Sequence, residues 1–334
     1  MNRSKRALSG RFVVTVAAGL ILVSGLTLIR STTATGRLAG TGASSSTPST
    51  TQIAAPEPAT TAIPASPLAV ASTRVPAFRH IYLIMFENHE YGSIVGSASA
   101  PYLNALVRHY GLATNYHAVA HPSLPNYLAL FSGSTQGVTD DAVHNLAGRN
   151  LVDQLHAHSR SFRVYAQNVP LGCYKGVTAS GGEDGTGTYA RKHEPAISFT
   201  DISGDRPRCA NILDFRHFSP SAATFELIVP NMCHSMHDCS VATGDAWLRS
   251  FLPRITGSSA FASSVVFVTW DEGSTSIGGG GRVATLVIGP GVKRAYRSGV
   301  SHTHYSLLRT IEDAWGLGCM NRTCAANDMR EFFR

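Results

Sequence analysis

The sequence predicts an α/β fold in which a mostly parallel sheet is covered by helices on both faces. Three short apolar runs, residues 81–86, 225–229 and 265–269, have the length of buried strands and are bounded by polar or turn residues. Segments with helical spacing alternate with the strands, as in parallel sheets. Each of the three runs stops on side chains that bind metals or phosphate. Because ligands of open α/β sheets bind beyond the carboxyl ends of the strands, we expect an enzyme site at that edge.

The other elements follow from the same patterns in chain order. Residues 100–110 place Leu103, Leu106 and Val107 at helical spacing, and residues 124–131 form a second helix with Leu124 and Leu128 on one face. We expect further helices at 151–158 and 307–315, and further strands at 162–166 and 285–288. The Gly-rich residues 178–187 are predicted to be a surface loop.

The N-terminal residues predict export. Residues 1–11 carry four basic residues and no acid, and residues 12–29 are uncharged and mostly apolar. That layout is typical of an export signal, here residues 1–30, although the run is long enough for an uncleaved membrane anchor. Residues 31–76 are mostly Ser, Thr, Ala, Pro and Gly, a composition that cannot bury enough apolar surface to fold. We therefore expect a disordered linker, one domain at 77–334, and a secreted or cell-surface protein.

Charge and cysteine content narrow the function classes. Residues 1–76 hold seven basic residues and one acid, so the remaining chain, with 21 basic and 20 acidic residues, is nearly neutral. Charge therefore gives no argument for nucleic-acid binding. All six cysteines follow the linker, and an even number in an exported chain favours disulfides. We expect the close pairs Cys233/Cys239 and Cys319/Cys324, which leave Cys173 with Cys209; zinc binding by the first pair is the weaker alternative.

Ser123 is the candidate nucleophile. It lies in the segment H-P-S-L-P-N, where Pro125 fits the first turn of a helix. Ser123 would then lie beside free backbone N–H groups and the positive end of the helix dipole, which favour a phosphate. Asn126, one turn later, is placed to donate to a phosphoryl oxygen. The alternative is that Ser123 is only a helix N-cap. A serine also needs a base or a metal to become nucleophilic.

The polar residues at the strand ends supply candidate metal ligands. Glu87 and Asn88 follow the first strand, and Asp271 and Glu272 follow the strand at 265–269. An oxygen-only set suits Ca²⁺, Mg²⁺ or Mn²⁺, whereas zinc or iron becomes plausible if imidazoles join the ligands. All 14 histidines lie in the predicted domain. Those that stand near the motifs are His121, His193, His237, His302 and His304.

Taken together, these motifs resemble a bacterial phosphoesterase family that includes secreted acid phosphatases and phosphatidylcholine-type phospholipases C. The match runs from about residue 78 to 318 and rests on the order of seven segments. These are F-E-N-H at 86–89, A-P-Y-L-N at 100–104, H-P-S-L-P-N-Y-L at 121–128, Y-A-R-K-H-E-P at 189–195, P-N-M-C-H-S-M-H-D at 230–238, T-W-D-E-G at 269–273 and H-Y-S-L-L-R-T-I-E-D at 304–313. The family's fold resembles the alkaline phosphatase superfamily, a doubly wound three-layer α/β/α sandwich.

The resemblance implies a role for each candidate residue. Ser123 would be the nucleophile and would form a phosphoserine. A divalent metal that activates the serine would be held by Glu87, Asn88, Asp271 and Glu272. The phosphoryl group would be bound by His193 and His237, with Asn126, His121 and the family's late histidine, His304, assisting. One position departs from the family pattern, because Ser235 stands where an aspartate is expected before Met-His.

The resemblance and the residues together predict an exported metal-dependent phosphomonoesterase of acid-phosphatase type, which we expect to be a monomer. Its substrate would be a phosphorylated small molecule or a phospholipid, with phosphoinositides among the candidates. Two other hypotheses stand beside this one. The first is a phospholipase C that uses the same residues on a phosphodiester. The second is a catalytically silent surface binding protein, which only the loss of a carboxylate at Ser235 favours.

Overall fold

The computed structural model describes residues 74–170, 173–181 and 187–334. The predicted export segment and nearly all of the predicted linker lie outside these residues. No helix in the described part of the chain is both long and apolar enough to cross a membrane. The buried core begins at Val75, close to the predicted start of the domain.

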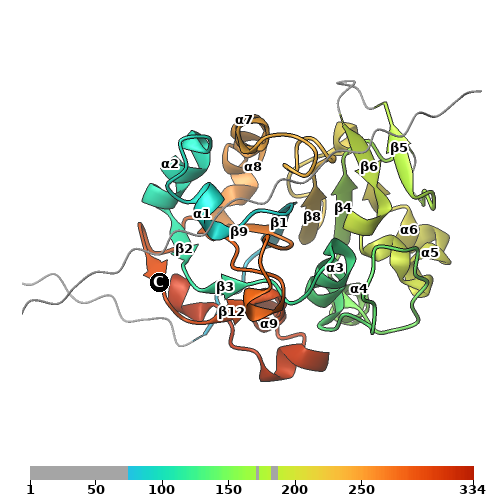
Figure 1. Ribbon diagram of the computed structural model, residues 1–334. Coiled ribbons are helices and arrows are strands. Elements are labelled where there is room, and N and C mark those ends of the chain that lie inside the picture. The colour runs from blue at the N-terminus through green and yellow to red at the C-terminus, as the bar shows by residue number, and fades with distance from the viewer. Residues whose placement is uncertain (1–73, 171–172, 182–186) are drawn as a thin grey trace, which may run out of the picture. The chain divides into compact units, whose positions relative to one another are not determined.

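The centre of the domain is an eight-stranded sheet (Figure 1) with the strand order β11-β2-β10-β9-β1-β8-β4-β7. The strands are β1 (His80–Phe86), β2 (Gly111–Ala113), β4 (Phe162–Ala166), β7 (Ile212–Leu213), β8 (Phe225–Val229), β9 (Ser264–Trp270), β10 (Thr285–Ile288) and β11 (Arg297–Ser298). All neighbours pair in parallel except β10, which is antiparallel to both β9 and β2. The sheet is therefore mostly parallel, as predicted.

The three strands that end on polar side chains lie side by side in the middle of the sheet. Every residue of β8 and β9 is buried, and so is every residue of β1 except His80. This explains their mainly apolar sequences, in which the buried Glu226 of β8 is the one charged side chain, because a strand covered on both faces has no polar side to alternate with. The register pairs Phe86 with Trp270, so that β1 and β9 end at the same level. Glu87 and Asp271 therefore emerge next to one another.

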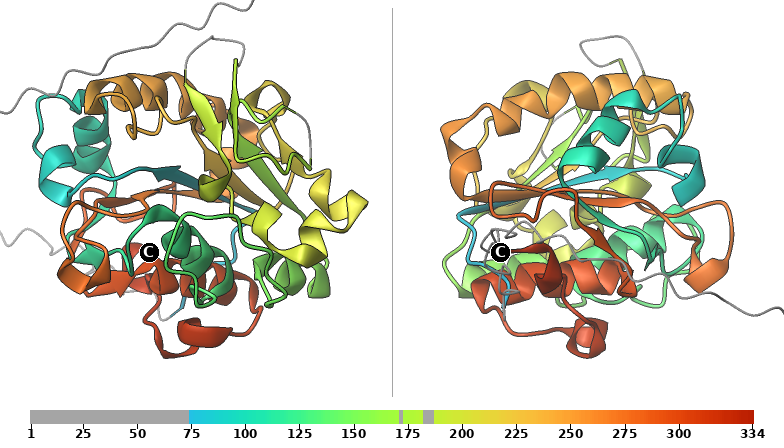
Figure 2. Two further views of the ribbon diagram at one scale, coloured as in Figure 1. Left: turned by 45° about the vertical axis from the view of Figure 1, so that its right-hand side comes forward. Right: turned by 90° about the vertical axis from the view of Figure 1, so that its left-hand side faces the viewer.

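Helices cover both faces of this sheet (Figure 2), which makes the predicted three-layer sandwich. One face carries α2 (Pro101–His109), α7 (Val241–Phe251) and α8 (Pro253–Thr256). The other carries α3 (Ser123–Ser132), α4 (Leu151–Ala157) and α9 (His304–Trp315). Within the second layer the Gln154 side chain of α4 donates to Glu312 of α9 at 3.0 Å. The two layers thus bury the central strands below the polar edge of the sheet.

Two differences from the expected elements have clear causes. Helix α7 was not predicted, and its sequence V-A-T-G-D-A-W contains Gly244, which weakens helix propensity. The glycine fits because a Cβ there would lie 2.4 Å from Cγ of Met236. The Gly-rich stretch predicted as a loop includes a strand, β5 (Thr178–Ser180), which forms an antiparallel ribbon with β6 (Thr188–Ala190). The prediction of a loop was therefore wrong at its first three residues.

The remaining described elements are short. They are α1 (Tyr91–Ile94), β3 (Tyr116–His117), β12 (His302–Thr303), α5 (Thr200–Ser203), α6 (Arg206–Cys209) and seven 3-10 turns. The pair β3 and β12 forms a small parallel ribbon that leads into α3 and α9. All six cysteines are paired as predicted, in the disulfides Cys173–Cys209, Cys233–Cys239 and Cys319–Cys324.

Candidate active site at the carboxyl end of the sheet

Ser123 is the first residue of α3, as predicted from Pro125 in the first turn. Its side chain is buried, and its Oγ donates to Oε2 of Glu87 over 3.4 Å. The backbone N–H of the next residue, Leu124, donates to Oδ1 of Asp141 at 3.0 Å. The serine hydroxyl thus lies between the start of a helix and the end of the central strand.

Asn126 fixes the backbone that leads into this serine. Its amide oxygen accepts from the N–H groups of Val119 (2.9 Å) and Ala120 (3.1 Å). Its amide nitrogen donates to the carbonyls of Ala120 (2.8 Å) and Pro122 (3.2 Å). Both ends of the amide are used within the loop, and the side chain is fully buried. We therefore interpret Asn126 as a residue that positions Ser123, in place of the phosphate contact expected from the sequence.

Glu87 and Asp271 form a buried carboxylate pair at the ends of β1 and β9. Burial, followed by the charge of Asp271, raises the pKa of Glu87 well above its usual range. Burial also raises the pKa of Asp271. The Tyr127 hydroxyl donates to Oε1 of Glu87. Oδ1 of Asp271 accepts from the backbone N–H groups of Asn88 (3.1 Å) and Glu272 (2.6 Å). Two acids this deeply buried favour protonation or a bound cation.

Two oxygen atoms, one in this pair and one beside it, have no hydrogen-bond partner among the described residues. They are Oδ1 of Asn88 and Oδ2 of Asp271, and both are buried. Buried polar atoms are almost always paired, so orphaned oxygens next to raised-pKa acids fit a divalent cation. The described residues contain no group of three or more His, Cys, Asp or Glu side chains placed to hold a metal. A cation bound beside Ser123 would instead take its ligands from the carboxylates of Glu87 and Asp271, the amide oxygen of Asn88 and the hydroxyl of Ser123.

The fourth predicted metal ligand, Glu272, points elsewhere. Its Oε2 lies 2.6 Å from Nδ1 of His121, whose Nε2 donates to the Thr275 carbonyl at 2.9 Å. Burial, followed by the charge of Asp271, raises the pKa of Glu272 to about 7. Burial opposes protonation of His121, but the Thr275 carbonyl and the Glu272 carboxylate raise its pKa overall. Glu272 and His121 therefore form a pair at the rim of the site.

His193 lies inside the site and is neutral. Its ring stacks on Tyr127, with centroids 5.4 Å apart and planes at 20°. Its Nε2 is 3.1 Å from Oε2 of Glu87, but the angles are not those of a hydrogen bond. Burial, followed by the charge of Lys192, lowers the pKa of His193 well below its usual range. The contact with Glu87 is therefore not an ion pair.

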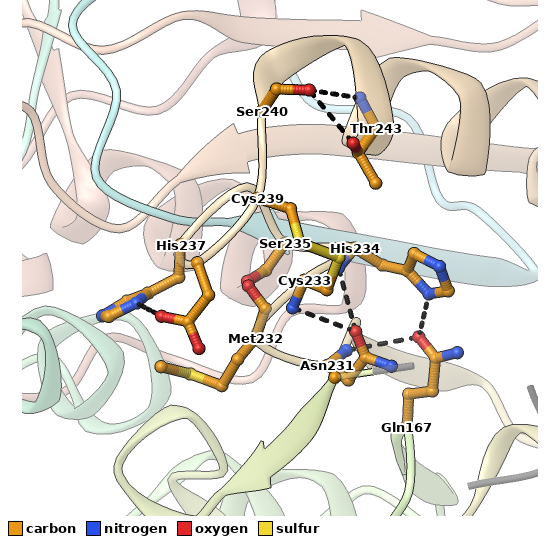
Figure 3. Close-up of a disulfide and its surroundings, with 12 residues drawn as sticks. Gln167, Asn231, Met232, Cys233, His234, Ser235, His237, Cys239, Ser240 and Thr243 are labelled. Atoms are coloured by element: carbon orange, nitrogen blue, oxygen red, sulfur yellow. Dashed lines mark hydrogen bonds and ion pairs between the residues drawn. A yellow bond between two sulfur atoms is a disulfide. The ribbon is translucent and has the colours of Figure 1, made fainter. Parts of the chain in front are cut away.

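His237 lies beside His193, at the more open side of the site. The two rings are 5.6 Å apart, and Nδ1 of His237 lies 2.7 Å from Oδ1 of Asp238. Figure 3 shows His237 and His234 on opposite sides of the Cys233–Cys239 disulfide, and Nδ1 of His234 lies 2.9 Å from the Gln167 amide oxygen. The disulfide loop thus turns His237 toward His193 and His234 away from it.

His304 holds the backbone of Asp271 through a hydrogen bond. Its Nε2 donates to the Asp271 carbonyl at 2.6 Å, and its Nδ1 accepts from the Tyr116 hydroxyl at 3.1 Å. Burial lowers the pKa of His304 to about 4, so the ring is neutral and both nitrogens are in use. The structure therefore assigns it to holding Asp271, not to the phosphate contact expected from the sequence. His302 lies with Glu331, 2.7 Å from its Oε1, and does not join the site.

Ser235, the departure from the family pattern, lies directly next to Glu87. Its carbonyl accepts the Glu87 N–H at 2.9 Å, and its Oγ donates to the Met232 carbonyl at 3.3 Å. It is buried. The position expected to carry a carboxylate thus carries a hydroxyl that bonds within its own loop, while its backbone carbonyl holds the Glu87 N–H.

Three residues of the site were not predicted. Tyr127 follows Ser123 by four residues, a spacing that places both on one helix face and could have identified it. Lys192 precedes His193; its Nζ lies 2.9 Å from Oδ2 of Asp141 and 3.5 Å from Nε2 of His237. Burial opposes the charge of Lys192, but the bond to Asp141 raises its pKa overall. Asp141 stands in no pattern that sequence reasoning would single out.

Comparison with known proteins assigns this chain to a family. The model of the Phosphoesterase family matches residues 96–318. The chain belongs to the phosphoesterase family. It is therefore a phosphoric ester hydrolase by family, and the predicted resemblance is confirmed.

Curated relatives carry phosphatase names. The chain is 32% identical over 251 residues to a phosphatidylinositol-3-phosphatase of Mycobacterium tuberculosis, an alignment that covers 74% of this chain and 80% of that protein. It is 30% identical over 257 residues to a probable acid phosphatase of Kluyveromyces lactis, covering 74% of this chain and 60% of that longer protein.

Solved structures show the same fold at low identity. The lipoteichoic acid synthase LtaP of Listeria monocytogenes superposes with a TM-score of 0.54 and 9% identity, over 77% of this chain and 76% of that chain. The phosphonate monoester hydrolase of Agrobacterium radiobacter gives a TM-score of 0.51 and 12% identity, over 76% and 77%. At these identities the similarity concerns the fold alone, and it agrees with the predicted alkaline-phosphatase-like α/β class.

Proposed function

We propose that this phosphoesterase is an exported, divalent-metal-dependent phosphomonoesterase of acid-phosphatase type that works through a phosphoserine on Ser123. One observation carries the proposal. The buried hydroxyl of Ser123 bonds to Glu87 beside the orphaned oxygens of Asn88 and Asp271. A nucleophile beside oxygen atoms that lack partners is an arrangement suited to phosphoryl transfer.

The metal would be held by Glu87, Asn88 and Asp271, with Ser123 completing the set. When bound, it would lower the pKa of the serine and neutralise charge on the reacting oxygens. The chain itself supplies the rest of the chemistry. Asn126 fixes the loop that positions the serine. Tyr127 donates a hydrogen bond to Glu87, and His193 stacks on the ring of Tyr127.

The phosphoryl group would be bound by the neutral imidazole of His193 and the charged amine of Lys192. His193 can donate a hydrogen bond without adding charge, and Lys192 keeps its proton beside His237. In the first step a bond forms between Ser123 Oγ and phosphorus, and the bond between phosphorus and the alcohol oxygen breaks. The serine loses one proton in this step, and the departing alcohol oxygen takes up one proton. Water then cleaves the phosphoserine and restores Ser123. Phosphoryl transfer depends mainly on such positioning and charge neutralisation.

Export and location rest on other features. Three disulfides are typical of proteins that mature in an oxidising compartment, and they agree with the basic and apolar N-terminal sequence. The acid-phosphatase and phosphatidylinositol-3-phosphatase names of the relatives support a monoester substrate, with phosphoinositides among the candidates.

The test is hydrolysis of p-nitrophenyl phosphate against p-nitrophenyl phosphorylcholine, before and after chelation of divalent ions. We expect turnover of the monoester, lost on chelation and in Ser123→Ala. Ser132→Ala is the matched control, because Ser132 is a second buried serine of α3 whose hydroxyl bonds, among the described residues, to Leu128, Ser134 and Gln136. Preferred turnover of the choline diester would favour a phospholipase C. A folded protein that turns over neither ester would be a binding protein.

A further inference from the structure

We propose that an apolar pocket beside Ser123 binds the alcohol portion of the substrate, so that the enzyme prefers phosphomonoesters of apolar alcohols. This inference rests on the proposed phosphomonoesterase function and adds the class of leaving group. The pocket has a volume of about 310 Å³. The apolar residues of its lining, called here the apolar wall, are Leu124, Ala142, Val143, Val177, Ala190 and Met232.

The pocket is lined by residues that neighbour or contact active-site residues, although Ser123, His193 and His237 are not in its lining. Leu124 directly follows Ser123, and Lys192, which lies at the pocket edge, directly precedes His193. Asp238, at the same edge, lies 2.7 Å from Nδ1 of His237. Met232 lies on the His237 side of the disulfide loop in Figure 3. A phosphate ester held at the serine therefore has its alcohol close to this wall.

The exposure of the wall is unusual for this chain. Among the described residues four large hydrophobic side chains are exposed, and two of them, Val143 (46%) and Val177 (59%), line this one pocket. They come from separate segments, the loop after α3 and the residue that precedes β5. Apolar side chains gathered at the mouth of a site, instead of scattered singly, indicate a surface that is covered by a ligand.

Charged groups at the edge are already paired, so the alcohol would meet the apolar wall together with the lining residues Thr178, Thr188 and Ser198. Lys192 and Asp141 form an ion pair at 2.9 Å, and Asp141 also accepts the Leu124 N–H. Arg191 donates to the Lys175 carbonyl at 2.7 Å. A sugar, an inositol or a second phosphate would have to compete with these bonds, whereas an alkyl or aryl group would not. This inference therefore disfavours phosphoinositides among the candidate substrates. By volume the pocket accommodates roughly ten non-hydrogen atoms, taking ~30 Å³ for each as in liquid water.

The test uses n-alkyl phosphates from ethyl to octyl, with release of inorganic phosphate as the readout. Their leaving groups are nearly equal in basicity, so a trend reports binding of the chain and not intrinsic reactivity. We expect kcat/KM to rise about two- to fourfold for each added methylene until the pocket is filled, and glycerol 1-phosphate to resemble ethyl phosphate.

Variants locate the effect. In the double variant Val143→Ser with Val177→Ser the preference for hexyl over ethyl phosphate should fall about tenfold, because the longer chain loses more apolar contact than the shorter one. Val300→Ser is the matched control, since Val300 is an exposed valine outside the pocket. Equal kcat/KM for ethyl and hexyl phosphate in the unmodified protein would overturn the inference while leaving the phosphatase intact. No phosphate release from any monoester would instead refute the proposed function, and this inference with it.

Discussion

Replacing Tyr127 by phenylalanine isolates the hydrogen bond that the active site places on Glu87. The Tyr127 hydroxyl is fully buried and donates to Oε1 of Glu87. Its removal leaves a buried carboxyl oxygen without that donor, a loss that costs about 1–3 kcal/mol of stability. Taking about 2 kcal/mol, a domain of this size should lose about 4–8 °C in melting temperature. The Glu87 pKa should also rise further, because this hydrogen bond lowers it.

Tyr189→Phe is the control that matches this change. The Tyr189 hydroxyl is equally buried but has no hydrogen-bond partner among the described residues. Deleting it should leave stability unchanged or slightly higher, because an unpaired buried hydroxyl is itself costly. Both variants are compared by thermal and urea unfolding in a chelator at pH 7. If Tyr127→Phe unfolds at the same free energy as Tyr189→Phe, the bond to Glu87 contributes nothing and the reasoning about this carboxylate fails.

Three further predictions concern the core, the loop and the cation. Burial raises the pKa of Glu226 from 4.5 to about 7. Because the folded state holds this proton more tightly than the unfolded state, the contribution of Glu226 to stability is complete below pH 4.5 and is lost as the pH rises through 7. Glu226→Gln should therefore gain about 2–3 kcal/mol relative to the unmodified protein between pH 5 and pH 8, and a pH-independent difference in urea unfolding would contradict this. Asn126→Ala should lower kcat about a hundredfold by loosening the loop before the serine, with a smaller change in KM; unchanged kcat would refute the positioning role. Mg²⁺, Ca²⁺ or Mn²⁺ at about 100 times Kd should raise the free energy of unfolding of the unmodified protein by about 2.7 kcal/mol and should leave that of Asp271→Asn unchanged. Equal stabilisation of both proteins would place the ion elsewhere.

The sequence predicted the five longest strands of the sheet, whose runs are mostly buried, but not the short strands β2, β7 and β11. The strands at 162–166, 225–229 and 285–288 are observed at those bounds, and the predicted three layers are present. Helix α7 was not predicted because Gly244 lowers the helix propensity of its segment. That glycine is explained by its close approach to the Met236 side chain. Such tertiary contacts leave no periodic signal in the chain.

The composition of the site was predictable, but the direction of each side chain was not. The register of β1 and β9 follows from matching runs and brings Glu87 beside Asp271. Whether Glu272 turns toward that pair or toward His121 depends on the loop that supplies Thr275. In the same way, His304 looks like a ligand in the sequence, yet both of its nitrogens are satisfied by the protein.

The most direct test of the central claim is the covalent intermediate itself. The protein is mixed with p-nitrophenyl phosphate, quenched in acid within milliseconds, digested and examined by mass spectrometry. The account predicts a phosphate of about 80 Da on the peptide that contains Ser123, present in Ser132→Ala and absent in Ser123→Ala. Turnover without a phosphopeptide, or with phosphate on another residue such as His193, would contradict Ser123 as the nucleophile.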